Sequence, residues 1–164
     1  MGTTDVARVC LWKNAPPIGE EAVLLSEQEG RGGSVTGCSP ISVFLVDDVP
    51  EMRELIRLGM EQDPGFEIIG EASDGRSAVD GVAATQPAAV LLDLSMPDMN
   101  GLEAILEIRS ANEDVAIIVL SGFSADRMGP PSLERGADGY VEKGTPMQEV
   151  RDATRLAVAK RRGD

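Results

Sequence analysis

Apolar and polar positions alternate in regular blocks from about residue 42 onward. The run SVFLVD (42–47) is apolar and rich in β-branched residues, which is typical of a buried strand. The next block, PEMRELIRLGMEQ (50–62), places Met52, Leu55, Ile56 and Met60 on one helical face. The two blocks therefore predict a strand followed by a helix.

The same alternation occurs four more times along the chain. The further predicted strands are FEIIGEA, AAVLLD, VAIIVLS and DGYVEK. The helices predicted after them are GRSAVDGVAATQ, GLEAILEIRSA, SADRMGPPSLERG and PMQEVRDATRLAVAKR. Continuous apolar runs are typical of parallel strands that helices cover on both faces. We therefore predict an α/β fold with a doubly wound, five-stranded parallel sheet of order 2-1-3-4-5, the flavodoxin-like arrangement.

The first forty residues differ in composition from the rest of the chain. They are rich in Gly, Pro, Ser and Glu, so we predict a mostly disordered extension over residues 1–40 and one domain over residues 41–164. Leu11 and Trp12 are apolar, so a docking patch for a partner is an alternative interpretation of this part of the extension. Cys10 and Cys38 lie in this part without CxxC spacing, and the chain has no histidine. No zinc or redox site is expected from them.

Charge and hydropathy exclude several classes of partner. The chain has 15 basic and 28 acidic residues, which gives a net charge of -13. This sign argues against direct binding of nucleic acid. The start of the chain does not resemble a signal peptide, and no segment approaches the 18 or so apolar residues of a membrane span. We therefore expect a cytoplasmic protein that does not insert into membranes.

Three acidic residues follow predicted strands at one edge of the sheet. Asp47 and Asp48 end the first strand, and Asp93 ends the third strand. Ligands of such folds bind beyond the carboxyl ends of the strands, near the switch point between the first and third strands. Neighbouring carboxylates repel one another unless a cation lies among them, and their hard oxygens suit Mg²⁺ or Mn²⁺. The sequence therefore predicts a divalent metal site.

Two phosphate-binding groups follow the remaining strands at the same edge. Ser121 ends the fourth strand, and Lys143 follows the fifth. A metal, a hydroxyl and an ammonium group around a carboxylate suit phosphoryl transfer, in which positioning and charge neutralisation dominate catalysis. Asp93 would then be the nucleophile and form an aspartyl phosphate.

The segments FLVDD, VLLDLSMPDMNG and DGYVEK together resemble the receiver domain of bacterial two-component response regulators. The resemblance runs from about Ile41 to Lys160. It implies that Asp93 is the phosphoacceptor, that Lys143 binds the phosphoryl group, and that Ser121 and Tyr140 form a switch. It also implies that the carboxylates of Asp47, Asp48 and Asp93 bind Mg²⁺. The backbone carbonyl of Ser95 would complete the metal shell.

The resemblance also implies partners and an output. A sensor histidine kinase or a phosphotransfer protein would supply the phosphoryl group, and the domain would catalyse its own phosphorylation and hydrolysis. A downstream protein or a second copy would read the face from the fourth to the fifth helix. Only four residues follow Lys160. We therefore expect no DNA-binding output domain after the receiver, which is either a stand-alone receiver or part of a longer protein.

Two stretches depart from the pattern of the family. Many receivers have proline directly after the lysine, whereas Lys143 is followed by Gly144-Thr145-Pro146. We predict that Thr145 caps the last helix and that Pro146 opens it. Gly129-Pro130-Pro131 falls inside the predicted fourth helix, where prolines remove hydrogen bonds. We predict that this helix is shortened, shifted or begun late, near Pro131.

Three other functions are compatible with parts of this pattern. A flavodoxin-like cofactor binder needs a Ser-, Thr- or Gly-rich loop after the first strand, where this chain has DDVPE. An acid-nucleophile hydrolase usually has a second acid two residues after the nucleophile, where this chain has Ser95. A pseudo-receiver that binds partners without phosphorylation usually lacks the acceptor or the lysine, and both are present. We therefore expect a phosphorylation switch.

Overall fold

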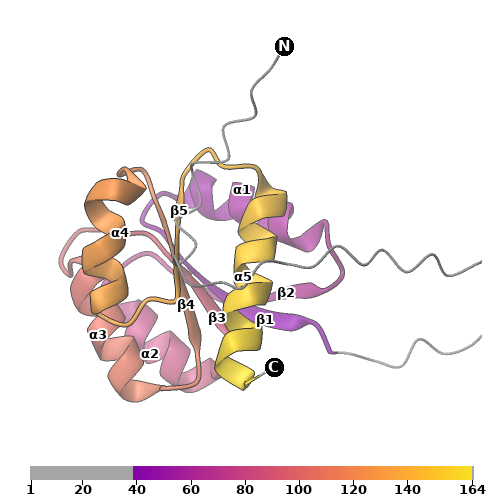
Figure 1. The fold of residues 1–164 in the computed structure, drawn as a ribbon, viewed down its shortest axis with the longest axis horizontal. Helices are drawn as coiled ribbons and strands as arrows, with labels where there is room; N and C mark the ends of the chain where they lie inside the picture. Colours follow the sequence, from indigo (N-terminus) through magenta and orange to yellow (C-terminus); the bar gives the residue numbers. More distant parts are fainter. Residues whose placement is uncertain (1–38, 164) are drawn as a thin grey trace, which may run out of the picture.

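The computed structural model of the protein describes residues 39–163, which form a parallel sheet between two layers of helices (Figure 1). The strands are β1 (Ile41–Val46), β2 (Phe66–Ala72), β3 (Ala89–Leu92), β4 (Ala116–Ser121) and β5 (Gly139–Glu142). The helices are α1 (Pro50–Glu61), α2 (Gly75–Thr85), α3 (Gly101–Ala111), α4 (Ala125–Glu134) and α5 (Met147–Arg162). The extension predicted over residues 1–40 lies outside the described residues except for its last two.

The strand order is β2-β1-β3-β4-β5, and all four pairs are parallel. The predicted fold class and order are therefore confirmed. Helices α1 and α5 cover one face of the sheet, and α2, α3 and α4 cover the other (Figure 1). Among residues 39–163, no helix is both long and apolar enough to cross a bilayer.

Each face of the sheet has its own hydrophobic core. Along β1, Val43 and Leu45 pack towards α1 and α5, whereas Phe44 and Val46 pack towards α2 and α3. This division follows from the period of two in a strand, which points successive side chains to opposite faces. All six residues of β4 are buried. The continuous apolar runs of the sequence therefore correspond to strands that are covered on both faces.

The buried face of α1 is narrower than the sequence pattern predicted. Ile56 and Met60 are buried, but Leu55 is 60% exposed. Consecutive helical residues differ by 100° in direction, so Leu55 lies beside the stripe of Ile56 and Met60. Gly59 completes this stripe, because a Cβ there would lie 2.6 Å from Cγ of Met147 in α5. The absence of a side chain at Gly59 thus lets the two helices pack closely.

The prediction that α4 begins near Pro131 is wrong. The helix begins at Ala125 and contains both Pro130 and Pro131. In an α-helix these two prolines leave the carbonyls of Asp126 and Arg127 without an N–H donor four residues later. Both residues are exposed, so water can bind their carbonyls. The prolines therefore cost less here than they would in a buried helix. At ten residues, α4 is one residue shorter than α2 and α3.

The start of α5 also differs from the prediction. Thr145 does not cap the helix, because its Oγ1 is buried and has no hydrogen-bond partner. Pro146 lies at the position before the first helical residue, Met147, and not inside the helix. Its carbonyl accepts hydrogen bonds from the N–H groups of Glu149 and Val150. Gly144 takes a φ of +95°, which only glycine adopts at little cost.

Candidate functional site

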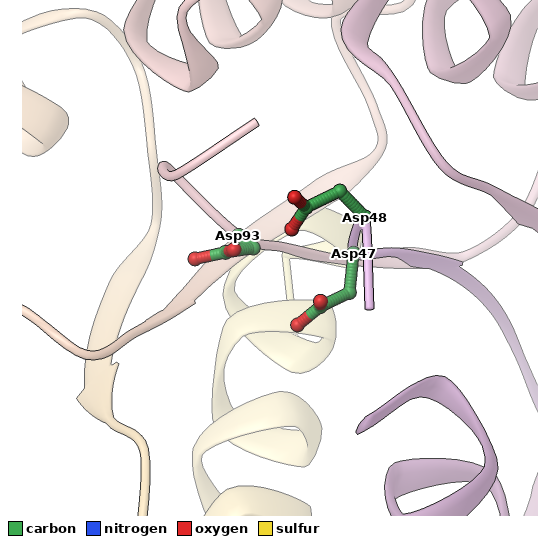
Figure 2. Close-up of side chains that lie close together, drawn as sticks. All are labelled: Asp47, Asp48 and Asp93. Atoms are coloured by element: carbon green, nitrogen blue, oxygen red, sulfur yellow. The ribbon is translucent and has the colours of Figure 1, made fainter. Parts of the chain in front are cut away.

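Three carboxylates meet at the carboxyl edge of the sheet, where β1 and β3 end. One oxygen from each of Asp47, Asp48 and Asp93 lies within 4.8 Å of the others. Figure 2 shows the three side chains at the ends of the two neighbouring strands. Asp47 is 2% exposed and Asp93 is 3% exposed. The structure therefore brings together the three acidic residues that the sequence singled out.

Lys143 reaches these carboxylates from the loop after β5. Its Nζ lies 2.6 Å from Oδ2 of Asp47 and 3.3 Å from Oδ2 of Asp93. The backbone N–H of Lys143 also donates to the carbonyl of Ser121, over 2.8 Å. The lysine is thus fixed at its backbone while its ammonium group lies between two acids. The predicted meeting of Lys143 with the acidic residues is found in the structure.

Burial and charge act in opposite directions on these groups. Burial raises the pKa of Asp93, and the nearby Lys143 ammonium only partly offsets this effect. Burial also disfavours the charge of Lys143, but the Asp47 and Asp93 carboxylates outweigh it and raise the pKa of Lys143. The lysine therefore stays charged at neutral pH. An added positive charge near Asp93 would favour its ionised form.

The residues present fit a divalent cation. Oδ1 of Asp93 is buried and has no hydrogen-bond partner among residues 39–163, although buried carboxylate oxygens are normally paired. Asp47 uses its Oδ1 to accept from the N–H of Val49, over 2.9 Å. Three acids face a single ammonium group here. A hard cation such as Mg²⁺, which prefers oxygen ligands, would balance the excess negative charge.

Ser121 and Tyr140 lie on the neighbouring strands β4 and β5 near this edge. Ser121 is fully buried at the end of β4, and Tyr140 in β5 is 1% exposed. The Tyr140 hydroxyl donates to the carbonyl of Phe123, over 2.8 Å. Burial raises the pKa of Tyr140, so the hydroxyl keeps its proton. Tyr140 is thus attached to the loop that joins β4 to α4.

Ser95 lies in the loop after β3, two residues beyond Asp93. It is exposed and lines an open hollow of about 700 Å³ together with Met96 and Phe123. The role of its backbone carbonyl in a metal shell remains a prediction.

Sequence reasoning missed two residues that support the site. Arg53 in α1 donates from Nη1 to the carbonyl of Asp47, over 2.6 Å. Glu142 accepts through Oε1 from the N–H of Ala125, over 2.8 Å. The second contact joins residues 17 positions apart, and no local spacing rule predicts it. The only signal in the sequence is that Glu142 directly precedes Lys143.

Comparisons with known proteins agree with this geometry. Residues 43–155 match the family described as response regulator receiver domain. The chain is 38% identical over 122 residues to Response regulator UvrY of Escherichia coli (strain K12), covering 74% of this chain and 56% of that protein. It is 32% identical over 120 residues to the nitrate/nitrite response regulator protein NarL of the same strain, covering 73% and 56%. The chain thus spans about half the length of these curated relatives.

A solved structure is similar over most of the described residues. The two-component response regulator of the LuxR family from Aurantimonas sp. SI85-9A1 has a TM-score of 0.71 and 31% sequence identity. The match covers 74% of this chain and 87% of that one. Because the family match also spans more than half of the sequence and includes all three carboxylates, the chain belongs to the response regulator receiver domain family.

Proposed function

We propose that Asp93 accepts a phosphoryl group from a phosphohistidine of a sensor histidine kinase or of a phosphotransfer protein. The observation that carries this proposal is the contact of Lys143 with both Asp47 and Asp93, beside an Asp93 oxygen that has no hydrogen-bond partner. Oδ2 of Asp47 is also buried without a hydrogen-bond partner, but it lies 2.6 Å from the Lys143 ammonium group, which leaves Oδ1 of Asp93 as the oxygen best placed to attack phosphorus. Receiver domains act together with histidine kinases. We propose that one such kinase, or a phosphotransfer protein, is the partner of this chain.

The chemistry needs only groups that lie at this edge. An Asp93 oxygen attacks phosphorus, the P–N bond of the phosphohistidine breaks, and its electron pair stays on the imidazole. Lys143 binds a phosphoryl oxygen, and the Ser121 hydroxyl donates to another. When bound by Asp47, Asp48, Asp93 and the carbonyl of Ser95, Mg²⁺ or Mn²⁺ supplies neutralisation of the phosphoryl charge.

The same groups serve the return reaction. A water molecule attacks phosphorus, the bond between phosphorus and the Asp93 oxygen breaks, and inorganic phosphate leaves. The Asp93 carboxylate is regenerated. The domain thereby limits the lifetime of its own signal.

The proposed switch runs from Ser121 to Tyr140. As the Ser121 hydroxyl turns towards the phosphoryl group, the Tyr140 ring and the loop bonded to it through Phe123 rearrange. This change alters the face from α4 to α5, where a downstream protein or a second copy of the chain binds. The hydrogen bond from Tyr140 to Phe123 supports this route, since it links the ring to the loop before α4.

Labelling of an Asp93→Asn variant tests the proposal. Wild-type protein is incubated with Mg²⁺ and acetyl phosphate, and the phosphorylated fraction is measured by intact mass and by peptide mapping. We expect labelling of the wild type and none of Asp93→Asn, because an amide is not a nucleophile here. Asp98→Asn is a matched control, since Asp98 is an exposed residue in the same loop. Undiminished labelling of Asp93→Asn, with the site mapped elsewhere, would overturn the assignment.

A further inference from the structure

The amino end of α4 is capped by a residue of β5. Ser124 occupies the position before the helix, and its side chain makes no capping hydrogen bond. Instead, Oε1 of Glu142 accepts from the Ala125 N–H, over 2.8 Å. A carboxylate at this position also interacts favourably with the positive end of the helix dipole. Glu142 of β5 thus caps the helix in place of Ser124.

Two more hydrogen bonds join β5 and the residue after it to the end of β4 and the loop before α4. The Tyr140 hydroxyl donates to the Phe123 carbonyl, and the Lys143 N–H donates to the Ser121 carbonyl, each over 2.8 Å. Glu142 lies between these two contacts along β5 and is paired with Ser121 in the sheet. Contacts from residues 140, 142 and 143 therefore hold residues 123, 125 and 121 respectively.

Helix α4 lacks two of the backbone hydrogen bonds that a regular helix of its length makes. Its ten residues include Pro130 and Pro131, which contribute no N–H donors. Its amino end therefore depends more than usual on a bond from outside the helix. Of the described contacts to backbone N–H groups in its first turn, the one from Glu142 is the only side-chain contact.

We propose that Glu142 is a positioning residue for the phosphoryl site, an inference that rests on the proposed function of Asp93. Its carboxylate holds Ala125 at the amino end of α4, and this fixed end keeps Ser121 at the carboxyl edge of the sheet while the Tyr140 ring and Phe123 rearrange. Without this hydrogen bond the loop before α4 samples other arrangements. Only the competent fraction of molecules then binds the phosphoryl group, and the apparent affinity falls in proportion.

Beryllofluoride, which occupies the place of a phosphoryl group on a carboxylate, is the probe for this inference. Its affinity in the presence of Mg²⁺ is measured by NMR titration for the wild type and four variants. We expect Glu142→Ala to bind about fivefold more weakly, an effect of the size of one lost capping bond. Glu142→Gln keeps an oxygen acceptor at the same reach and should bind like the wild type. Glu142→Asp is one methylene shorter and should bind like Glu142→Ala.

Glu134→Ala is the matched control. Glu134 is exposed at the last residue of α4, and its loss should leave the affinity unchanged. Hydrogen exchange of the Ala125 amide reports the cap directly and should accelerate in Glu142→Ala and Glu142→Asp only. Thermal unfolding is recorded for every variant, so that affinities are compared at a temperature at which all the variants are fully folded.

The outcomes separate this inference from the proposed function. If Glu142→Ala binds beryllofluoride as tightly as Glu134→Ala does, the inference is wrong. It is also wrong if Glu142→Gln binds as weakly as Glu142→Ala, since the charge would then matter and not the hydrogen bond. If the alanine variant does not fold, the comparison of Gln with Asp decides. Failure of the wild type to bind beryllofluoride would overturn the proposed function and this inference together.

Discussion

At the scale of single residues, the Lys143 ammonium group contacts the carboxylates of both Asp47 and Asp93. Its ammonium group is closer to Asp47 than to Asp93, by 2.6 Å against 3.3 Å. The order of motifs along the sequence predicted that Lys143 would reach the acids. It did not predict the preference for Asp47, which depends on side-chain conformations at the ends of three strands. A phosphoryl group on Asp93 would compete with Asp47 for this ammonium group.

A second ion pair gives a prediction for the pH dependence of stability. The hydrogen bond from Arg155 holds the pKa of Asp63 below its usual value, and the N–H of Gly65 adds to this effect. Because the folded-state pKa is lowered, the stabilisation is complete above the unfolded-state pKa, which is about 3.9. It is lost as the pH falls through the folded-state pKa.

Urea unfolding of wild type and Asp63→Asn tests this at several pH values. We expect the variant to be less stable at pH 7 and the difference to shrink as the pH falls below about 4. Asp80→Asn is a suitable control, because Asp80 has no hydrogen bond or ion pair among the described contacts. A difference between wild type and Asp63→Asn that stays constant down to pH 3 would contradict the prediction.

At the scale of elements, the sequence predicted every strand and helix from residue 41 onward. Five strand-helix blocks were visible because buried parallel strands are continuously apolar. The errors lie where tertiary contacts override local rules. Pro130 and Pro131 argued against a helix upstream of them, yet Glu142 caps that helix at Ala125. Thr145 looked like a cap, yet its hydroxyl makes no hydrogen bond.

Helix α4 yields a prediction about stability. In Pro130→Ala, a new N–H can bond to the Asp126 carbonyl, and the steric conflict of the proline ring with the preceding turn disappears. The unfolded chain gains freedom, which offsets part of this. We expect the free energy of unfolding to rise by about 1 kcal/mol, as measured by urea unfolding.

A loop proline provides the contrast for this measurement. Pro97 lies outside the helices and is exposed, so Pro97→Ala gains no helical hydrogen bond. Its loss should lower the free energy of unfolding by about 0.4 to 1 kcal/mol, through the unfolded chain alone. A Pro130→Ala variant that is less stable than the wild type would show that the proline fits α4 better than the helix geometry implies.

At the scale of the whole molecule, the carboxyl edge of the sheet and the opposite edge carry different groups of charged residues. The carboxyl edge carries the acids and Lys143, whereas an ion-pair network lies around Asp138, at the start of β5. Asp138 accepts from Arg109 of α3 at 2.8 Å and from Arg161 of α5 at 2.7 Å. This network ties together helices from both faces of the sheet. The residues of this network lie 29 and 23 positions apart in the sequence, so the local patterns that predicted the strands and helices did not predict it.

The central claim is that the acidic edge binds a phosphoryl group and transmits this to α4. Backbone NMR spectra of the protein with Mg²⁺, recorded before and after addition of beryllofluoride, test it most directly. We expect shifts at Asp48, Asp93 and Lys143 and, through Tyr140, at the amides of Phe123 and Ala125. Asp93→Asn should show none of them. Unchanged spectra of the wild type would contradict phosphoryl binding, and shifts confined to the acidic edge would contradict the coupling to α4.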